Sequence, residues 1–200
     1  MLDAQFYNYS LSFINKIGMS GHSKWSQIKR KKELTDAKKG RIFSKLAKLI
    51  EVAAKNGTDI KTNLSLKTII DSAKAANMPA TNIERAIKKG GGLDKENSNL
   101  EEIIYEAYGP GGVAMIIQVV TSNKNRTAAE IKHILSKNNA SLSGRGSVKW
   151  LFEQKYENGA VDWLPKQTIK LSPDDENKLE VLMEELDENE DVSEVFTNAE

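Results

Sequence analysis

The sequence lacks cysteine, and it has only two histidines and four prolines among its 200 residues. The absence of cysteine excludes disulfide scaffolds, zinc ribbons, thiol nucleophiles and iron–sulfur clusters, and it fits a reducing compartment. No apolar run approaches the roughly 20 residues that a membrane span needs. A hydrophobic content of 39% and a charged content of 28% are instead typical of a globular protein. The length allows one or two ordinary domains.

A net charge of only +1 conceals two halves of opposite sign. Residues 1–93 carry 18 basic and 7 acidic side chains, whereas residues 94–200 carry 11 basic and 21 acidic ones. The segment 19–49 is the most basic, with ten lysines and arginines against Glu33 and Asp36. Such dense like charge is costly unless a polyanion offsets it. The pattern therefore favours contact with nucleic acid over a merely solvated helix face, without separating DNA from RNA.

The first half of the chain divides into a leader and a helical domain. Residues 1–18 are predicted to be a leader outside the fold, with Met19 as the natural start, because they fit neither a signal peptide nor a mitochondrial presequence. Residues 19–93 are predicted to form a basic helical bundle. Apolar periodicity indicates helices over 36–56 and 64–76, and a capping box of Thr81 and Glu84 predicts the start of a third helix.

Residues 94–200 are predicted to form an acidic α+β domain. Strands are expected over 100–107, 113–120, 148–152, 168–171 and 192–196. A helix is expected over 127–137 after a capping box of Thr127 and Glu130, and another after the Ser172-Pro173 N-cap. From residue 113 onward this order is βαββαβ, the ferredoxin-like motif, with the strand 100–107 as an extra N-terminal strand. The fold class is therefore α+β.

No motif in the sequence supports catalysis. His22 and His133 have no carboxylate partner that the sequence identifies. The stretch 143–147 (SGRGS) lacks the order of a nucleophile elbow, and the glycines of 109–112 are not followed by the lysine of a phosphate-binding loop. The acidic segment 172–200 lacks the alternating ligands of a calcium loop. We therefore expect no enzyme, no cofactor and no metal.

Five ordered segments together resemble one protein family. They are residues 19–29 (MSGHSKWSQIK), 36–43 (DAKKGRIF), 76–79 with 82–87 (ANMP, NIERAI), 105–112 (YEAYGPGG) and 123–127 (NKNRT). These segments are similar to those of the YebC/PmpR family of transcriptional regulators, which includes the mitochondrial translational activator of cytochrome c oxidase subunit I. The resemblance extends over residues 19–200.

The resemblance implies a cytoplasmic, non-enzymatic protein that associates with nucleic acid and not with a membrane. Some family members are described as DNA-binding regulators, and others act on the ribosome, where they contact ribosomal RNA and relieve stalls at proline-rich stretches. Three functions therefore remain open: a DNA-binding transcriptional regulator, a ribosome-associated translation factor, and an oligomerising or effector-binding interaction module. The expected partners are duplex DNA, ribosomal RNA or the ribosome, and the expected state is a monomer or a weak oligomer.

The expected binding residues are basic positions of the first domain and two positions before the helix at 127–137. They are Lys24, Lys29, Arg30, Lys31, Lys32, Lys38, Lys39, Arg41, Lys45, Asn123 and Arg126. The aromatic ring of Trp25 is either a platform for a nucleic-acid base or an anchor in the helical core. Asn123 and Arg126 either bind nucleic acid or serve only as loop and cap residues.

The sequence departs from the family pattern at one place. Family members usually carry three domains, the third of which is inserted into the second. Here residues 152–157 (FEQKYE) run almost directly into residues 159–161 (GAV), which resemble the segment after that insertion. We therefore expect the inserted domain to be missing near 157–161 and the α+β domain to fold without it.

Overall fold

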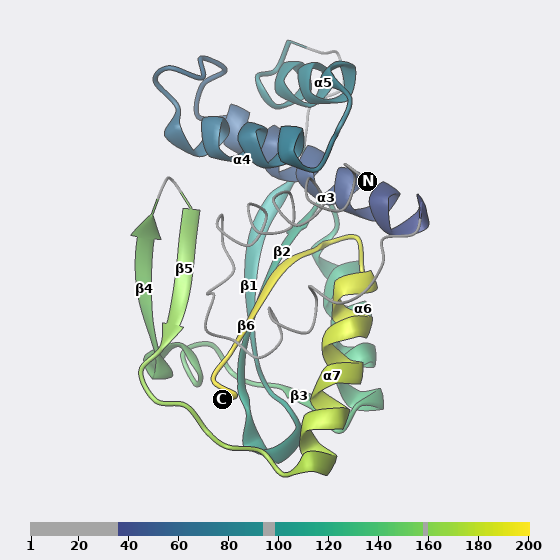
Figure 1. Ribbon diagram of the computed structural model, residues 1–200, viewed down its shortest axis with the longest axis vertical. Helices are drawn as coiled ribbons and strands as arrows, with labels where there is room; N and C mark the ends of the chain where they lie inside the picture. Colours follow the sequence, from purple (N-terminus) through teal and green to yellow (C-terminus); the bar gives the residue numbers. More distant parts are fainter. Residues whose placement is uncertain (1–35, 94–98, 158–159) are drawn as a thin grey trace, which may run out of the picture.

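The computed structural model describes residues 36–93, 99–157 and 160–200. Helices α3, α4 and α5 gather at one end of the molecule, and a sheet flanked by two helices and a hairpin forms the rest (Figure 1). The helical and α+β halves are thus two spatial regions that meet along α3. The leader and the segment 19–35 lie outside the described residues.

The helical region consists of α3 (Asp36–Ala54), α4 (Leu64–Ala75) and α5 (Ala80–Gly90). Their apolar stripes converge on one core, in which Ile50, Leu66 and Ile83 are buried. Gly90 lets α5 approach α3 closely, because a Cβ atom there would lie 2.1 Å from the carbonyl oxygen of Glu51. The predicted helical bundle is confirmed over its described part.

The caps of these helices agree only partly with the sequence prediction. Asn63 begins α4, and its side chain accepts a hydrogen bond from the Leu66 amide, which is worth about 1 kcal/mol at a typical N-cap. The predicted capping box at Thr81 is wrong, since α5 begins at Ala80 after Pro79 and has no side-chain cap. Proline presets a helix-compatible entry without supplying a side-chain hydrogen-bond acceptor.

The main sheet is antiparallel and has the strand order β3-β1-β2-β6. Its strands are β1 (Glu101–Tyr108), β2 (Ala114–Thr121), β3 (Ser141–Leu142) and β6 (Val192–Thr197). A turn containing the short helix Pro110–Gly112 joins β1 to β2, and Gly111 there has a φ of 65°, a conformation that glycine adopts without strain. The strands predicted at 100–107 and 113–120 are confirmed, and they pair with each other as a hairpin.

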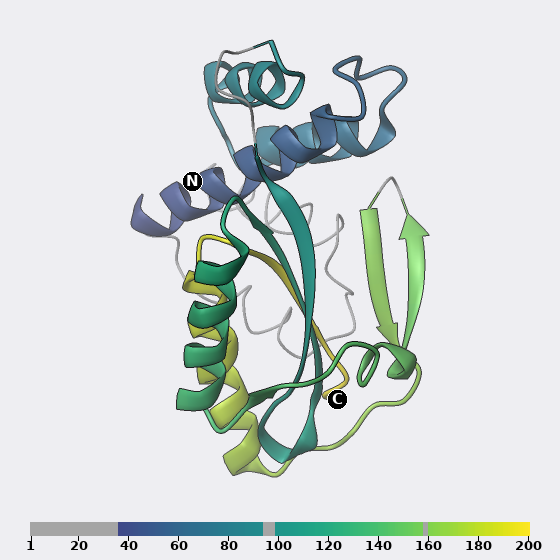
Figure 2. The ribbon, with the colours of Figure 1, turned by 180° about the vertical axis from the view of Figure 1, so that it is seen from behind.

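Helices α6 (Lys124–Lys137) and α7 (Pro173–Glu188) both cover one face of this sheet, as Figure 2 shows. Their buried side chains, such as Leu135 and Leu182, pack against Met115, Ile117 and Val119 of β2. The opposite face carries a second hairpin made of β4 (Phe152–Glu157) and β5 (Ala160–Pro165). A separate cluster containing Phe152, Trp163 and Phe196 joins this hairpin to the sheet.

The α+β class is confirmed, but the predicted ferredoxin-like strand order is wrong. The segment predicted as a strand at 148–152 contains a short helical turn, Lys149–Leu151, before β4. Val148 and Phe152 are buried, while Trp150 between them is exposed. A helical turn explains this pattern, because two side chains four residues apart can lie on the same side of it. The segment 168–171 makes one bridge, between Ile169 and Ala199, and is no strand.

The strand 100–107, predicted as an extra N-terminal strand, is confirmed as β1. As β1 it lies between β3 and β2, and β3 takes the outer place with two residues that carry no periodic signal. The sheet therefore follows the order ββαβαβ, and β4 and β5 stand apart as a hairpin. At the start of α7 the predicted cap is confirmed, because Ser172 accepts a hydrogen bond from the Asp175 amide.

Candidate nucleic-acid interface at the α3–α7 junction

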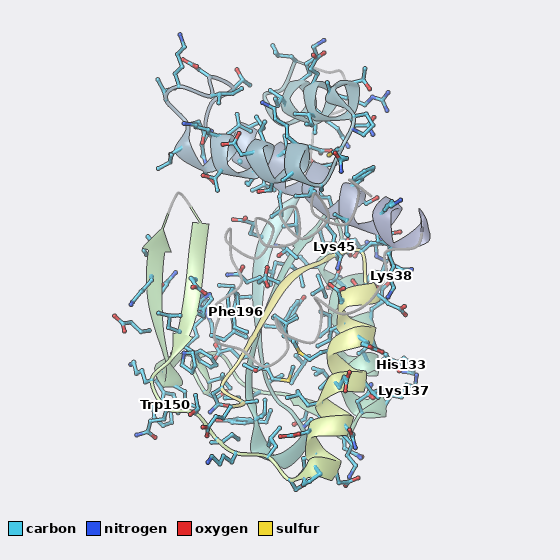
Figure 3. The ribbon with its side chains drawn as sticks, viewed as in Figure 1. Lys38, Lys45, His133, Lys137, Trp150 and Phe196 are labelled. Carbon is cyan, nitrogen blue, oxygen red and sulfur yellow. The ribbon has the colours of Figure 1, made fainter. Side chains whose placement is uncertain are left out.

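The basic side chains of α3 lie against the C-terminal end of α7. Arg41 forms an ion pair with Glu188 at 3.5 Å, and Lys45 forms one with Asp187 at 3.3 Å. Lys38 and Lys39 are half-buried one turn earlier on the same helix. Figure 3 shows Lys38 and Lys45 above the end of α7, at the boundary between the two regions. The two oppositely charged halves of the chain thus meet within the molecule.

Asp191, in the turn between α7 and β6, is the centre of this contact and is only 4% exposed. Its Oδ1 accepts a hydrogen bond from Lys48 at 2.6 Å, and its Oδ2 accepts from Thr127 at 2.6 Å and from Arg126 at 2.7 Å. Burial by itself would raise the pKa of Asp191, but these three donors outweigh it and hold the pKa well below its ordinary value. The carboxylate therefore stays ionised and ties α3 to α6. We call Arg41, Lys45, Lys48 and Arg126 with their carboxylate partners Asp187, Glu188 and Asp191 the junction.

Asn123 and Arg126 both have structural roles in the first turn of α6. Asn123 is the N-cap, and its Oδ1 accepts a hydrogen bond from the Arg126 amide at 3.1 Å. The guanidinium of Arg126 reaches back to Asp191, whose hydrogen bond and charge raise the pKa of the arginine. The capping box predicted at Thr127 is wrong, because Thr127 lies inside α6, where its buried hydroxyl bonds to Asp191. Helix α6 begins three residues earlier than predicted because asparagine is an equally good cap.

The remaining predicted binding residues lie in the part of the chain outside the described residues. They are Lys24, Trp25, Lys29, Arg30, Lys31 and Lys32. Their assignment stays a prediction. The structure thus brings Arg41, Lys45 and Arg126 together at the junction, with Lys38, Lys39 and Asn123 beside it.

A second group of basic side chains, which the sequence prediction missed, lies on α4 and α5 of the helical region. Lys67 and Lys74 are exposed on α4, and Arg85 and Lys88 are exposed on α5. Within the described residues none of these four forms an ion pair. Their spacings of seven and three residues place each pair on one side of its helix. That spacing is readable from the sequence, although these residues are less dense along the chain than the basic run at 19–49.

The described ranges offer little support for a metal site or a membrane span. In residues 36–93, 99–157 and 160–200, no group of three or more histidines, aspartates and glutamates could hold a metal ion. His133 is exposed on α6 (Figure 3). Nor is any helix in these ranges long and apolar enough to cross a membrane.

The fold and the junction define a protein in which a basic helical region is held against an α+β region by ion pairs. The family model "TACO1/YebC protein N-terminal domain" matches residues 23–93. The model "TACO1/YebC second and third domain" matches residues 100–157 and 154–199. The chain therefore belongs to the TACO1/YebC family, and the resemblance seen in the sequence is confirmed.

Several relatives carry the name "probable transcriptional regulatory protein". One from Thermoanaerobacter pseudethanolicus is 41% identical over 240 aligned positions, which cover 91% of this chain and 97% of the relative. One from Caldanaerobacter subterraneus subsp. tengcongensis is also 41% identical, with coverage of 91% and 98%. A crystal structure of a conserved hypothetical protein from Aquifex aeolicus has a TM-score of 0.80 and 33% identity, and the match covers 89% of this chain and 97% of that one.

The alignments show that the relatives have additional residues, which bears on the expected loss of the inserted domain. An alignment of 240 positions is longer than this chain, so the relatives contain residues that have no counterpart here. The two pieces of the second family match meet at the end of β4. The position of the missing domain near 157–161 stays a prediction.

Proposed function

We propose that this chain is a nucleic-acid-binding regulator of gene expression that works without catalysis, in the cytoplasm, as a monomer or weak oligomer. Membership of a family whose relatives are named probable transcriptional regulatory proteins supports the regulatory part. Binding to duplex DNA is the first form of the proposal, and binding to ribosomal RNA on the ribosome is its alternative.

One observation carries the nucleic-acid part of the proposal. Lys67, Lys74, Arg85 and Lys88 are exposed on the helical region and form no ion pair within the described residues. Lysine and arginine in this setting bind phosphates and release the counterions condensed on a nucleic acid. Arg41, Lys45 and Lys48 of α3 are engaged with carboxylates, so a phosphate would have to displace those partners first. We therefore assign the first phosphate contacts to α4 and α5.

The test compares two triple variants in a duplex-DNA shift and in ribosome co-sedimentation, each over a salt series. K67A/K74A/K88A should weaken the productive interaction and reduce the magnitude of the negative slope of log affinity against log salt by about 2 to 3 for duplex DNA. K38A/K39A/R41A should have a smaller effect. The triple variant K132A/K155A/K178A removes the same charge from the α+β domain and serves as the matched control.

Two results would contradict the proposal. The unmodified chain should bind one of the two targets with an affinity that falls as salt rises, and binding of neither target would exclude the proposed function. An equal loss of affinity in K67A/K74A/K88A and in the control would show that binding depends only on the net charge of the chain. In that case the interaction-module alternative, tested by the oligomeric state, would be favoured.

A further inference from the structure

A buried carboxylate shapes the loop that follows β3. Glu106 of β1 is 4% exposed, and its oxygens accept hydrogen bonds from the backbone amides of Gly146 at 2.6 Å, Val148 at 2.7 Å and Lys149 at 2.9 Å. Burial acts to raise the pKa of Glu106, but the three amides lower it further than burial raises it. Three charge-assisted hydrogen bonds to one side chain fix the course of this loop.

The fixed loop carries an exposed indole. Trp150 is 64% exposed, although tryptophan is on average a highly buried residue, and Trp163 of the same chain is 4% exposed. The indole N–H of Trp150 and the hydroxyl of Tyr108 both donate to the carbonyl oxygen of Ser147, at 2.9 and 3.0 Å. Tyr108 is 37% exposed. Their polar atoms are thus held in place beside Ser147 while much of the rings remains in solvent, and Trp150 lies at the outer edge of the molecule (Figure 3).

The segments on either side of the second hairpin, one of which carries Trp150, are basic in an otherwise acidic half of the chain. Residues 138–152 and 163–172 contain two lysines or arginines each and no aspartate or glutamate. Lys166 donates from Nζ to the carbonyl oxygen of Trp150 at 2.9 Å, and Lys149 lies 5.4 Å from the ring centre of Trp163. Arg145 is exposed and forms no ion pair within the described residues. The carboxylate of Glu106 beneath them is occupied by backbone amides.

We infer that Tyr108, Arg145, Lys149, Trp150 and Lys166, together called the loop surface, bind a single-stranded nucleic acid. An exposed aromatic ring stacks on an unpaired base, and nearby cations neutralise the adjoining phosphates. A base within a duplex is already stacked on both sides and offers no face to such a ring. The inference rests on the proposed function and adds a second contact to it, on the α+β domain and not on the helical one.

The experiment measures the fluorescence anisotropy of labelled oligouridylate RNA and oligothymidylate DNA of about 12 nucleotides on the full chain, within the range that single-strand sites cover. Trp150→Ala should weaken binding by about tenfold, and Trp150→Phe should weaken it by less than about threefold because phenylalanine still stacks. Arg145→Ala should reduce the magnitude of the negative slope of log affinity against log salt by about 0.7. A preference between the two oligonucleotides shows whether RNA or DNA is the natural strand.

Two further variants separate a binding surface from a general effect on the fold. Tyr156→Ala removes a ring that is 74% exposed at the far end of β4 and should leave the affinity unchanged. Glu106→Gln keeps every side chain of the loop surface but weakens the anchoring of the loop. It should reduce affinity for the single strand at constant affinity for duplex DNA, which marks Glu106 as a positioning residue.

The outcomes distinguish a failure of this inference from a failure of the proposed function. If Trp150→Ala binds the single strand as tightly as the unmodified chain, the loop surface is not a binding site, whatever happens with duplex DNA. If the unmodified chain binds single strands only weakly but still binds duplex DNA or ribosomes, the inference fails and the proposed function stands. If it binds no nucleic acid at all, both fail together.

Discussion

The junction and the loop surface both contain lysine and arginine, but in opposite surroundings. At the junction each cation has a carboxylate partner from α7 or from the turn after it, and Asp191 is buried among three donors. At the loop surface the buried carboxylate of Glu106 is occupied by backbone amides, and Lys166 donates to the carbonyl oxygen of the exposed Trp150. The difference shows that the density of charge along a chain does not identify the residues available to a ligand. Availability depends on what the fold places opposite each charge.

The largest expected effect comes from removing the centre of the junction. Asp191→Ala should lower the free energy of unfolding by about 3 kcal/mol, because it removes the buried carboxylate that pairs with Lys48 and accepts hydrogen bonds from Arg126 and Thr127. Urea denaturation measures this loss. Glu188→Ala, which removes an exposed carboxylate of the same junction, is the control. Equal losses in the two variants would show that Asp191 does not organise the contact.

Acid should lower the free energy of unfolding through both buried carboxylates, Asp191 at the junction and Glu106 beneath the loop surface. The pKa values of Asp191 and Glu106 are both lowered in the folded chain, so the unfolded chain takes up their protons first as the pH falls. Their stabilisation is present above the unfolded pKa values of about 4 and is lost as the pH falls through the folded values. Unfolding free energies measured from about pH 6 to about pH 3 should decrease, and less steeply in Asp191→Asn. An equal slope in that variant would contradict the assignment to Asp191.

The smallest effect is expected at the exposed edge of the junction. A double-mutant cycle of Arg41→Ala and Glu188→Ala should give a coupling energy of about 0.5 kcal/mol, because solvent screens this ion pair. The coupling should fall further when salt is added. A value above about 2 kcal/mol would mean that this pair, and not Asp191, holds the regions together.

Local signals predicted much of the fold correctly. The stripes of α3 and α4, the hairpin of β1 and β2 and the Ser172 cap each depend on a few neighbouring residues, so the sequence shows them directly. The strand order could not be predicted in the same way. β3 has only two residues, and the stretch around Trp150 is too short for its period to separate a strand from a helical turn. Which strands pair is decided by contacts between distant residues.

The candidate site likewise has a part that the sequence predicts and a part that depends on contacts between distant residues. The cations at 38–48 and the motif at 123–127 were readable from the sequence, and so was the family. Their carboxylate partners were not, because Lys48 and Asp191 are 143 residues apart and no periodicity links them. The sequence by itself determined the class of fold, the two charged halves and the family. Only the tertiary structure decided which charges neutralise one another, because a buried carboxylate such as Asp191 or Glu106 selects its donors through packing.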